Sequence, residues 1–245
     1  MDLELEWIEL LLLALIAMGG GFVQRVTGFG LGIFVMLFLP FLFEAHSDAA
    51  AISSLFSFGA STYNAIRKRK DIPFKTVMPA LAAALVTIPI SVYLAKFITA
   101  DFFDILLGIV LILLSIYFLF FNNRIKIRPT VVNGAIAGSL GGTLTGLFST
   151  GGPPIVLYLT NATDDPKVYF AATQFYFAVT SLYATGTRAI NGIITWELLL
   201  YALIGMVGCL LGNLLGKFVF ERFNGKQLKT VIYIAMIVSG VLMLL

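Results

Sequence analysis

Residues 138–154 read GSLGGTLTGLFSTGGPP and lie inside an apolar run that continues to Leu159. Six glycines and two adjacent prolines in these 17 residues are not compatible with one continuous membrane helix. Because Pro154 lacks an N–H group and Pro153 restricts the residue before it, a helix that arrives from Val131 is predicted to break near residues 149–152. Inside a bilayer, irregular backbone persists only within protein or beside a wet cavity. We therefore predict that this break forms part of a binding site.

A second stretch of the same kind lies near the start of the chain, where residues 19–40 read GGGFVQRVTGFGLGIFVMLFLP. The two stretches match when the sequence is shifted by 122 residues, and residues further on match with a shift of 121. The sequence is thus predicted to contain a duplication within one membrane domain, with residues 1–122 as the first repeat and residues 123–245 as the second. The matching pairs are Gly19–Gly20 with Gly141–Gly142, Gly30 with Gly152, Ile33 with Ile155, Arg67 with Arg188, and Lys96–Phe97 with Lys217–Phe218.

The composition is that of an integral membrane protein. Of the 245 residues, 59% are hydrophobic and 12% are charged, about half the roughly 25% charged residues of a soluble domain. Cys209 is the single cysteine and His46 the single histidine, which excludes an intrachain disulfide and a metal site built from several thiolates or imidazoles. We expect no cofactor and no nucleic-acid partner. The acidic start, MDLELEWIEL, is unlike a cleavable signal peptide.

Ten apolar stretches follow one another along the chain, which predicts an all-α membrane fold. The longer ones approach the ~20 residues needed to cross a bilayer. Gly151–Leu159, at nine residues, is predicted to go only part of the way. The stretches are Ile8–Gln24, Thr27–Phe43, Ala49–Ile66, Thr76–Lys96, Phe103–Phe121, Val131–Leu147, Gly151–Leu159, Val168–Thr187, Leu198–Gly216 and Leu228–Leu245.

The positions of lysine and arginine indicate how the repeats are oriented, because cytoplasmic loops are enriched in these residues. With four full crossings in each half, the halves would be parallel and the cations of the second half would face outward. With a hairpin at each broken stretch, each half has about five helical segments, the second half is inverted, and 13 of the 16 cations are cytoplasmic. We therefore predict two inverted repeats whose hairpin tips meet inside the protein, with both chain termini outside the cytoplasm. The 13 cations are Arg67, Lys68, Arg69, Lys70, Lys75, Arg124, Lys126, Arg128, Lys167, Lys217, Arg222, Lys226 and Lys229.

The two predicted tips have the chemistry to bind an anion. The start of a helix presents unpaired N–H groups and partial positive charge, and glycine lets a ligand approach the backbone. Serine and threonine are apt caps for such helices. The alternative is that the glycines only permit close packing of helices. The candidate substrate-binding residues at the tips are Thr27, Gly28, Gly30, Ser149, Thr150, Gly151 and Gly152.

Three further polar residues are candidates for substrate binding. An arginine within the membrane costs at least ~2.5 kcal/mol, so Arg25 beside the first tip should be paired or functional. If the first stretch crosses completely, Arg25 is instead a flanking residue, and Gln24 shares both interpretations. Gln174 either contacts substrate or bonds another helix. Arg188 could be an entry residue for anions, but the favoured interpretation is a flanking charge at the end of its segment.

The motifs together resemble the sulfite exporter TauE/SafE family. The resemblance rests on the glycine-rich first segment, the TGFG of Thr27–Gly30, the GGPP of Gly151–Pro154 that follows Gly138–Gly142, and the two similar halves. It covers nearly the whole chain. It implies a multi-pass permease of the bacterial inner membrane that carries sulfite, sulfonates or related small anions, usually outward.

The predicted function is a secondary transporter of a small anion, because the sequence contains no nucleotide-binding motif to power primary transport. The expected partners are that anion and the lipid bilayer, with H⁺ or Na⁺ as the coupling ion or with uniport, and the oligomeric state is left open. The alternatives are a transporter of small carboxylates, an anion channel and a noncatalytic membrane assembly subunit. We do not expect an enzyme, because nucleophile–base and metal constellations are absent from the sequence.

Overall fold

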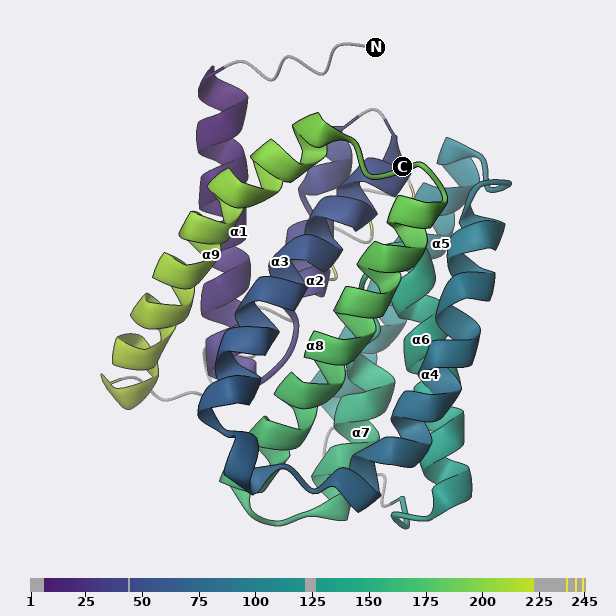
Figure 1. The fold of residues 1–245 in the computed structure, drawn as a ribbon, viewed down its shortest axis with the longest axis vertical. Coiled ribbons are helices and arrows are strands. Elements are labelled where there is room, and N and C mark those ends of the chain that lie inside the picture. The colour runs from purple at the N-terminus through teal and green to yellow at the C-terminus, as the bar shows by residue number, and fades with distance from the viewer. Residues whose placement is uncertain are drawn as a thin grey trace.

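The computed structural model describes residues 7–43, 45–121, 127–222, and the single positions 237, 241 and 244. The described chain is helical, with short irregular connections (Figure 1). Its elements are α1 (Trp7–Thr27), α2 (Leu31–Met36), η1 (Leu39–Phe41), α3 (His46–Arg67), η2 (Arg69–Asp71), α4 (Phe74–Ala95), α5 (Ala100–Ile116), η3 (Tyr117–Phe121), α6 (Val131–Phe148), α7 (Gly152–Ala162), α8 (Pro166–Ile190) and α9 (Trp196–Arg222).

The break predicted within residues 138–154 is confirmed. Helix α6 ends at Phe148, Ser149 adopts a left-handed conformation with φ of 59°, and α7 begins at Gly152. Pro153 is tolerated because it lies in the first turn of α7, where its missing N–H group has no partner to lose. With 11 residues, α7 is about 16 Å long, so it is the partial crossing that the sequence predicts.

Residues 19–40 break in the same way, with α1 ending at Thr27 and α2 beginning at Leu31. Gly28 and Gly30 have φ of 82° and 92°, a region in which a side chain would be strained. The apolar stretch 27–43 therefore forms no long helix: α2 has six residues, and Pro40 lies in the short 3₁₀ helix that follows. We call residues 24–33 the first tip and residues 145–155 the second tip.

The helices pack in three lengthwise pairs: α1 with α9, α4 with α6, and α3 with α8. Figure 1 shows α3 and α8 between the other two pairs. Glycine allows the two helices of each outer pair to approach each other until their backbones touch. A Cβ atom built on Gly21 of α1 would lie 2.0 Å from the carbonyl oxygen of Cys209, and one on Gly138 of α6 would lie 2.0 Å from that of Ala80.

Polarity separates the outer helices from the central pair. Four described helices are long and apolar enough to cross a membrane, namely α1, α4, α6 and the part of α9 from Trp196 to Phe218. The central helices carry more buried polar side chains than any of these four, and such side chains face protein because unpaired polar groups are costly in lipid. Those of α3 are Ser53, Ser54, Ser61 and Asn64, and those of α8 are Thr173, Gln174, Thr180, Ser181 and Arg188. The chain is thus an all-α, multi-pass membrane protein.

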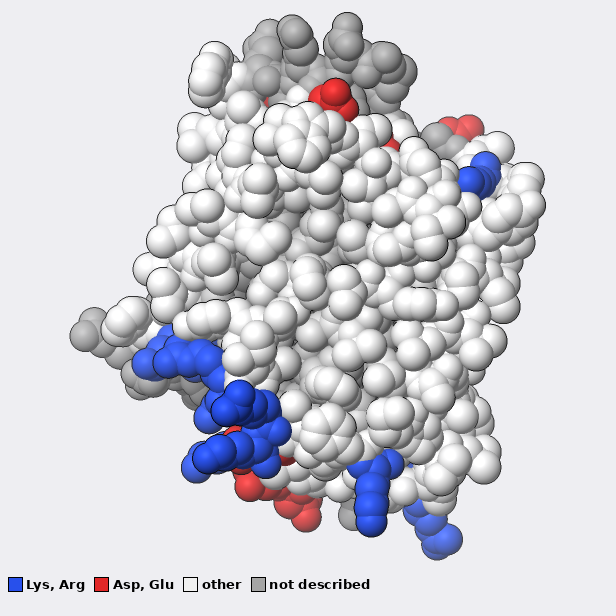
Figure 2. Space-filling model, in the orientation of Figure 1, with Lys and Arg blue, Asp and Glu red and all other residues white. Residues whose placement is uncertain are grey.

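Lysine and arginine gather at one end of the molecule (Figure 2). We call this the basic end; it includes Arg25, Arg67, Lys68 and Lys217, which line one pocket at the ends of α1, α3 and α9. The opposite end includes His46 and Lys96. The chain termini, whose location the sequence predicts, lie outside the described residues. So do four of the predicted cytoplasmic cations: Arg124, Lys126, Lys226 and Lys229.

Candidate functional site

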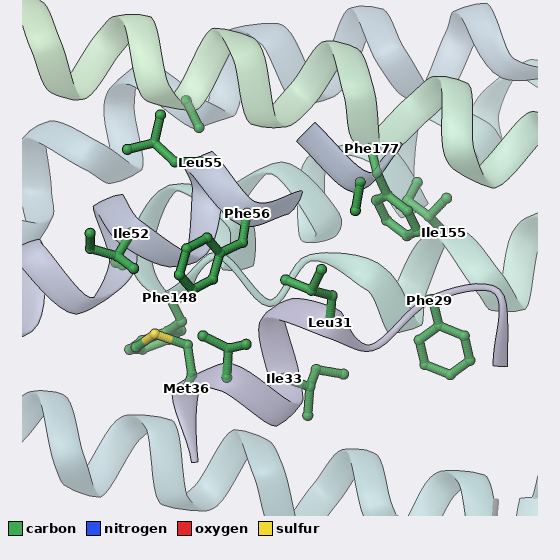
Figure 3. Close-up of a cluster of buried hydrophobic side chains, with 14 of the residues drawn as sticks. Phe29, Leu31, Ile33, Met36, Ile52, Leu55, Phe56, Phe148, Ile155 and Phe177 are labelled. Carbon is green, nitrogen blue, oxygen red and sulfur yellow. The ribbon is translucent and has the colours of Figure 1, made fainter. Parts of the chain in front are cut away.

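The two tips meet at a cavity inside the bundle. A Cβ atom built on Gly32 of the first tip would lie 2.0 Å from the carbonyl oxygen of Ser149, so the tips touch through their backbones. Apolar side chains surround this contact, and in Figure 3 Phe29, Leu31 and Ile33 share one cluster with Ile155 and Phe177. The cavity, which we call the tip cavity, is lined by Gln24, Phe29, Gly30, Leu31, Gly32, Ile33, Ser57, Thr145, Ser149, Thr150, Gly151, Gly152, Phe177, Thr180 and Ser181.

The tip cavity is small, with about 20 Å³ of free volume. That is room for about one water molecule. A substrate larger than water can therefore enter only if the tips or the neighbouring helices move apart.

Hydroxyl groups supply most of the side-chain polarity of the second tip. Ser149 Oγ lies 2.9 Å from Ser54 Oγ of α3. The Thr150 side chain is 1% exposed, and its hydroxyl has no hydrogen-bond partner among the described residues. Buried polar groups normally have a partner in protein or water. Thr150 thus presents a hydrogen-bonding group that a ligand in the cavity would satisfy.

The amide groups of the two tips are unequal. The first helical hydrogen bond of the first tip runs from Phe34 N–H to Gly30 O at 2.9 Å. The amides of Leu31, Gly32 and Ile33 precede it and therefore have no partner within the helix. At the second tip, Pro153 and Pro154 have no N–H group. The second tip therefore relies more on hydroxyls than the sequence argument from helix ends assumes.

Gln24 and Gln174 fasten the first tip to the central helices. Gln24 Nε2 donates to Ser61 Oγ at 2.8 Å and to Gln174 Oε1 at 2.9 Å. Gln174 Nε2 donates to Gly28 O at 2.8 Å. The helix–helix bonding that the sequence left open for Gln174 is therefore present. Thr27 holds the loop locally, because its hydroxyl donates to Val23 O at 2.9 Å and accepts from Phe29 N–H at 3.2 Å.

The structure brings six of the ten predicted site residues together at the tip cavity: Gln24, Gly30, Ser149, Thr150, Gly151 and Gly152. Thr27, Gly28 and Gln174 support the first tip without lining the cavity. Arg25 lies at the basic end, with its guanidinium 5.5 Å from the centre of the Phe170 ring. Residues of α3 and α8 that the sequence analysis did not propose complete the lining: Ser57, Phe177, Thr180 and Ser181.

Arg188 is not a flanking charge, and that interpretation was wrong. Its side chain is 2% exposed and donates to Thr145 O at 3.1 Å, Gly146 O at 2.9 Å and Ser54 Oγ at 2.5 Å. The guanidinium thus contacts the second tip directly at Thr145 and Gly146, and it reaches Ser149 through Ser54. No described carboxylate pairs with Arg188. Its positive charge therefore acts on the tip cavity without a neutralising neighbour.

One sequence signal would have found Arg188. Gln174, Ser181 and Arg188 are seven residues apart, so they share one face of α8. Ser181 lies between the other two and lines the tip cavity, where its hydroxyl donates to Ser57 Oγ at 3.0 Å. A polar face on an otherwise apolar membrane helix points to the protein interior.

These features define a class: a helical membrane protein with a closed polar cavity between two broken helices and a buried cation beside it. The comparisons with known proteins agree with this class. The sequence model of the sulfite exporter TauE/SafE family matches residues 13–243, and the chain belongs to that family. The probable sulfite/organosulfonate exporter TauE of Cupriavidus necator is 26% identical over 207 residues, which cover 81% of this chain and 79% of that protein. No solved structure matches the chain.

Proposed function

We propose that this protein carries sulfite or a small organosulfonate across the membrane and binds it in the tip cavity. The observation that carries the proposal is the buried Thr150 hydroxyl, which has no hydrogen-bond partner among the described residues and lies where the two tips meet. Family membership and the exporter name of the Cupriavidus relative support the substrate class. Arg188 supports the sign of the charge, because it places a cation close to the cavity.

The bound oxyanion would accept hydrogen bonds from both tips. Thr150 and Ser149 donate from the second tip, and the amides at the start of α2 donate from the first. Hydrogen bonds from neutral donors hold an anion without a desolvated ion pair, whose strong grip would slow release. Arg188 adds a favourable field from a distance.

We further infer that the two halves are inverted repeats. The counterparts of α1, α3 and α4 in the second half are α6, α8 and α9. The packed pair α1–α9 then corresponds to the packed pair α6–α4, and α3 and α8 correspond to each other. The pockets at the two ends correspond as well. Arg25, Asn213 and Lys217 of the basic pocket match Leu147, Val92 and Lys96 of the opposite pocket. Such symmetry would let one arrangement open toward each side in turn.

In this proposal the basic end faces the cytoplasm, in accordance with the enrichment of cations in cytoplasmic loops. The Arg188 network then closes the outer side of the tip cavity. An open anion channel fits less well, because about 20 Å³ of free volume leaves no continuous pore in this state. A carrier that loads from the cytoplasm corresponds to export.

The test is flux through the purified chain in liposomes. Sulfite, sulfoacetate, taurine, thiosulfate and acetate are compared as substrates, and counterflow is measured to separate a carrier from a channel. We expect saturable, counterflow-competent flux of sulfite or a sulfonate. Preference for acetate would favour the carboxylate alternative. The absence of flux for every anion would favour an assembly subunit.

A matched pair of variants tests the location of the site. Thr150→Val keeps the side-chain shape and removes the unpartnered hydroxyl. Thr160→Val is the control, because Thr160 is exposed on α7 and its hydroxyl donates to Val156 O at 2.8 Å. We expect Thr150→Val to weaken sulfite binding by about 1–3 kcal/mol without lowering thermal stability. Equal affinities in the two variants would place the substrate elsewhere.

A further inference from the structure

We propose a second anion site at the basic end, separate from the tip cavity, that receives the oxyanion before transport. We call it the basic pocket; it has a volume of about 410 Å³. Its ligand would be a small oxyanion with two negative charges. The role of the site in loading rests on the proposed function, whereas binding itself does not. The pocket is lined by Arg25, Tyr63, Asn64, Arg67, Lys68, Phe170, Asn213, Leu214 and Lys217.

Four cations converge on this pocket, and no carboxylate of a described side chain lines it. None of the four forms an ion pair with a described carboxylate. Aromatic groups hold the two guanidinium groups: Arg67 donates to Tyr63 Oη at 2.7 Å, and Arg25 lies over the Phe170 ring. These contacts orient the charges but do not neutralise them. An anion in the pocket would relieve their mutual repulsion.

The simpler interpretation is that these cations only flank membrane helices. Arg25 and Arg67 do lie in the last turns of α1 and α3, where cations are favoured. That interpretation predicts one cation for each helix end, each facing solvent or lipid headgroups. It does not predict that cations from three helices line one concave pocket.

Asn213 supplies the independent evidence for a ligand. It lines the pocket on α9 and is 5% exposed, and its side-chain nitrogen has no hydrogen-bond partner among the described residues. A buried amide donor without an acceptor is unusual in proteins. The matching residue of the opposite pocket is Val92, which has no donor, and the matching Lys96 donates to Asn191 O. Of the two end pockets, as the described residues line them, the basic pocket is therefore the better equipped to hold an anion.

Three side-chain amides connect the basic pocket to the tip cavity. Asn64 lines the basic pocket, and its Nδ2 donates to Gln174 Oε1 at 3.2 Å. Gln24 lines the tip cavity and donates to the same oxygen at 2.9 Å. The two donors that meet at Gln174 Oε1 thus come from the two sites. An oxyanion could replace that oxygen as their acceptor, so the route inward offers neutral N–H groups at each step.

The experiment measures binding of radiolabelled sulfite to the purified full-length protein at low ionic strength. We expect two classes of site, a tighter one in the tip cavity and a weaker one in the basic pocket. Asn213→Leu and the double variant Arg67→Gln/Lys217→Gln should each remove most of the weak class and leave the tight class. Lys167→Gln is the control for charge, because Lys167 is an exposed cation at the same end. Thr150→Val should weaken only the tight class.

The outcomes separate this proposal from the proposed function. If Asn213→Leu and the double variant bind sulfite like Lys167→Gln, the basic pocket is not an anion site and the proposal is overturned, whatever Thr150→Val does. If the weak class disappears in those variants while Thr150→Val changes nothing, the basic pocket stands and the tip cavity does not. In liposomes, the double variant should raise the KM for sulfite at low salt several-fold with little change in kcat. High salt should abolish that difference by screening.

Discussion

At the scale of single residues, Arg188 is the side chain that holds α8, α6 and α3 together beside the tip cavity. A buried charge is tolerated only when its donors are satisfied. Arg188 achieves this with two carbonyl oxygens in the last turn of α6 and one hydroxyl of α3. The guanidinium thereby joins α8, α6 and α3 at the end of the second tip. Arg67, its counterpart in the proposed repeat, is exposed, donates to Tyr63 Oη at 2.7 Å and lies over the Tyr63 ring.

Replacing Arg188 tests this closure. Arg188→Met keeps an unbranched apolar stem and removes the guanidinium. Thr145 O still accepts from Ser149 N–H at 3.0 Å and Ser54 Oγ still contacts Ser149 Oγ, so Gly146 O is the acceptor that loses its donor. We expect a loss of about 1–3 kcal/mol for each buried group left unsatisfied. A lower melting temperature and weaker sulfite binding should follow, measured on purified protein.

Arg188→Lys distinguishes the charge from the hydrogen bonds. Lysine keeps the positive charge but lacks the planar fork that reaches several acceptors at once. It should recover part of the sulfite affinity and little of the stability. Wild-type stability and flux in Arg188→Met would show that the network closes nothing.

At the scale of helices, glycine allows the two helices within each outer pair to contact each other. Gly21, Gly208 and Gly212 place α1 and α9 in backbone contact, and Gly138, Gly142 and Gly146 do the same for α4 and α6. The packing role that the sequence left open for the glycines is therefore real for those within α1, α6 and α9. The glycines of the tips differ among themselves: Gly28 and Gly30 adopt positive φ, whereas Gly32 and Gly151 also allow close backbone approach, to Ser149 O and Gly141 O.

Alanine substitutions test the packing. Gly21→Ala would place a methyl group against the Cys209 carbonyl and push α1 from α9. Overpacking of this kind typically costs about 1–3 kcal/mol. Gly186→Ala is the control, because a Cβ there meets no atom within 4 Å. Thermal unfolding in detergent should show Gly21→Ala destabilised and Gly186→Ala unchanged or slightly stabilised; equal stabilities would contradict the packing role.

The sequence predicted the breaks well and the closure poorly, for a physical reason. A helix break is a local event, so the glycines and prolines of residues 27–32 and 149–154 locate it directly. The lining from Ser57, Phe177, Thr180 and Ser181 depends on how α3 and α8 pack, which no local pattern states. Arg188 was misjudged for another reason: its place near the end of α8 suggested exposure, and its seven-residue spacing from Ser181 and Gln174 on one helix face was not used.

At the scale of the whole molecule, orientation is the main prediction. The protein has one cysteine, the buried Cys209, so a Cys209→Ala background allows single cysteines to be added. Lys70→Cys reports on the basic end and Asp101→Cys on the opposite end, since both positions are exposed. A membrane-impermeant maleimide added to intact cells should label position 101 and not position 70. The reverse pattern would invert the molecule and make the basic end the outer surface.

The smallness of the tip cavity has a consequence for the speed of the protein. The backbones of Gly32 and Ser149 touch beside a cavity of about 20 Å³. If the substrate passes through the tip cavity as we propose, it must first separate these well-packed groups. The activation enthalpy of each turnover then includes lost van der Waals contact, which diffusion through a water-filled pore does not require. Flux should rise steeply on warming, and bulky sulfonates should move more slowly than sulfite even when they bind equally well.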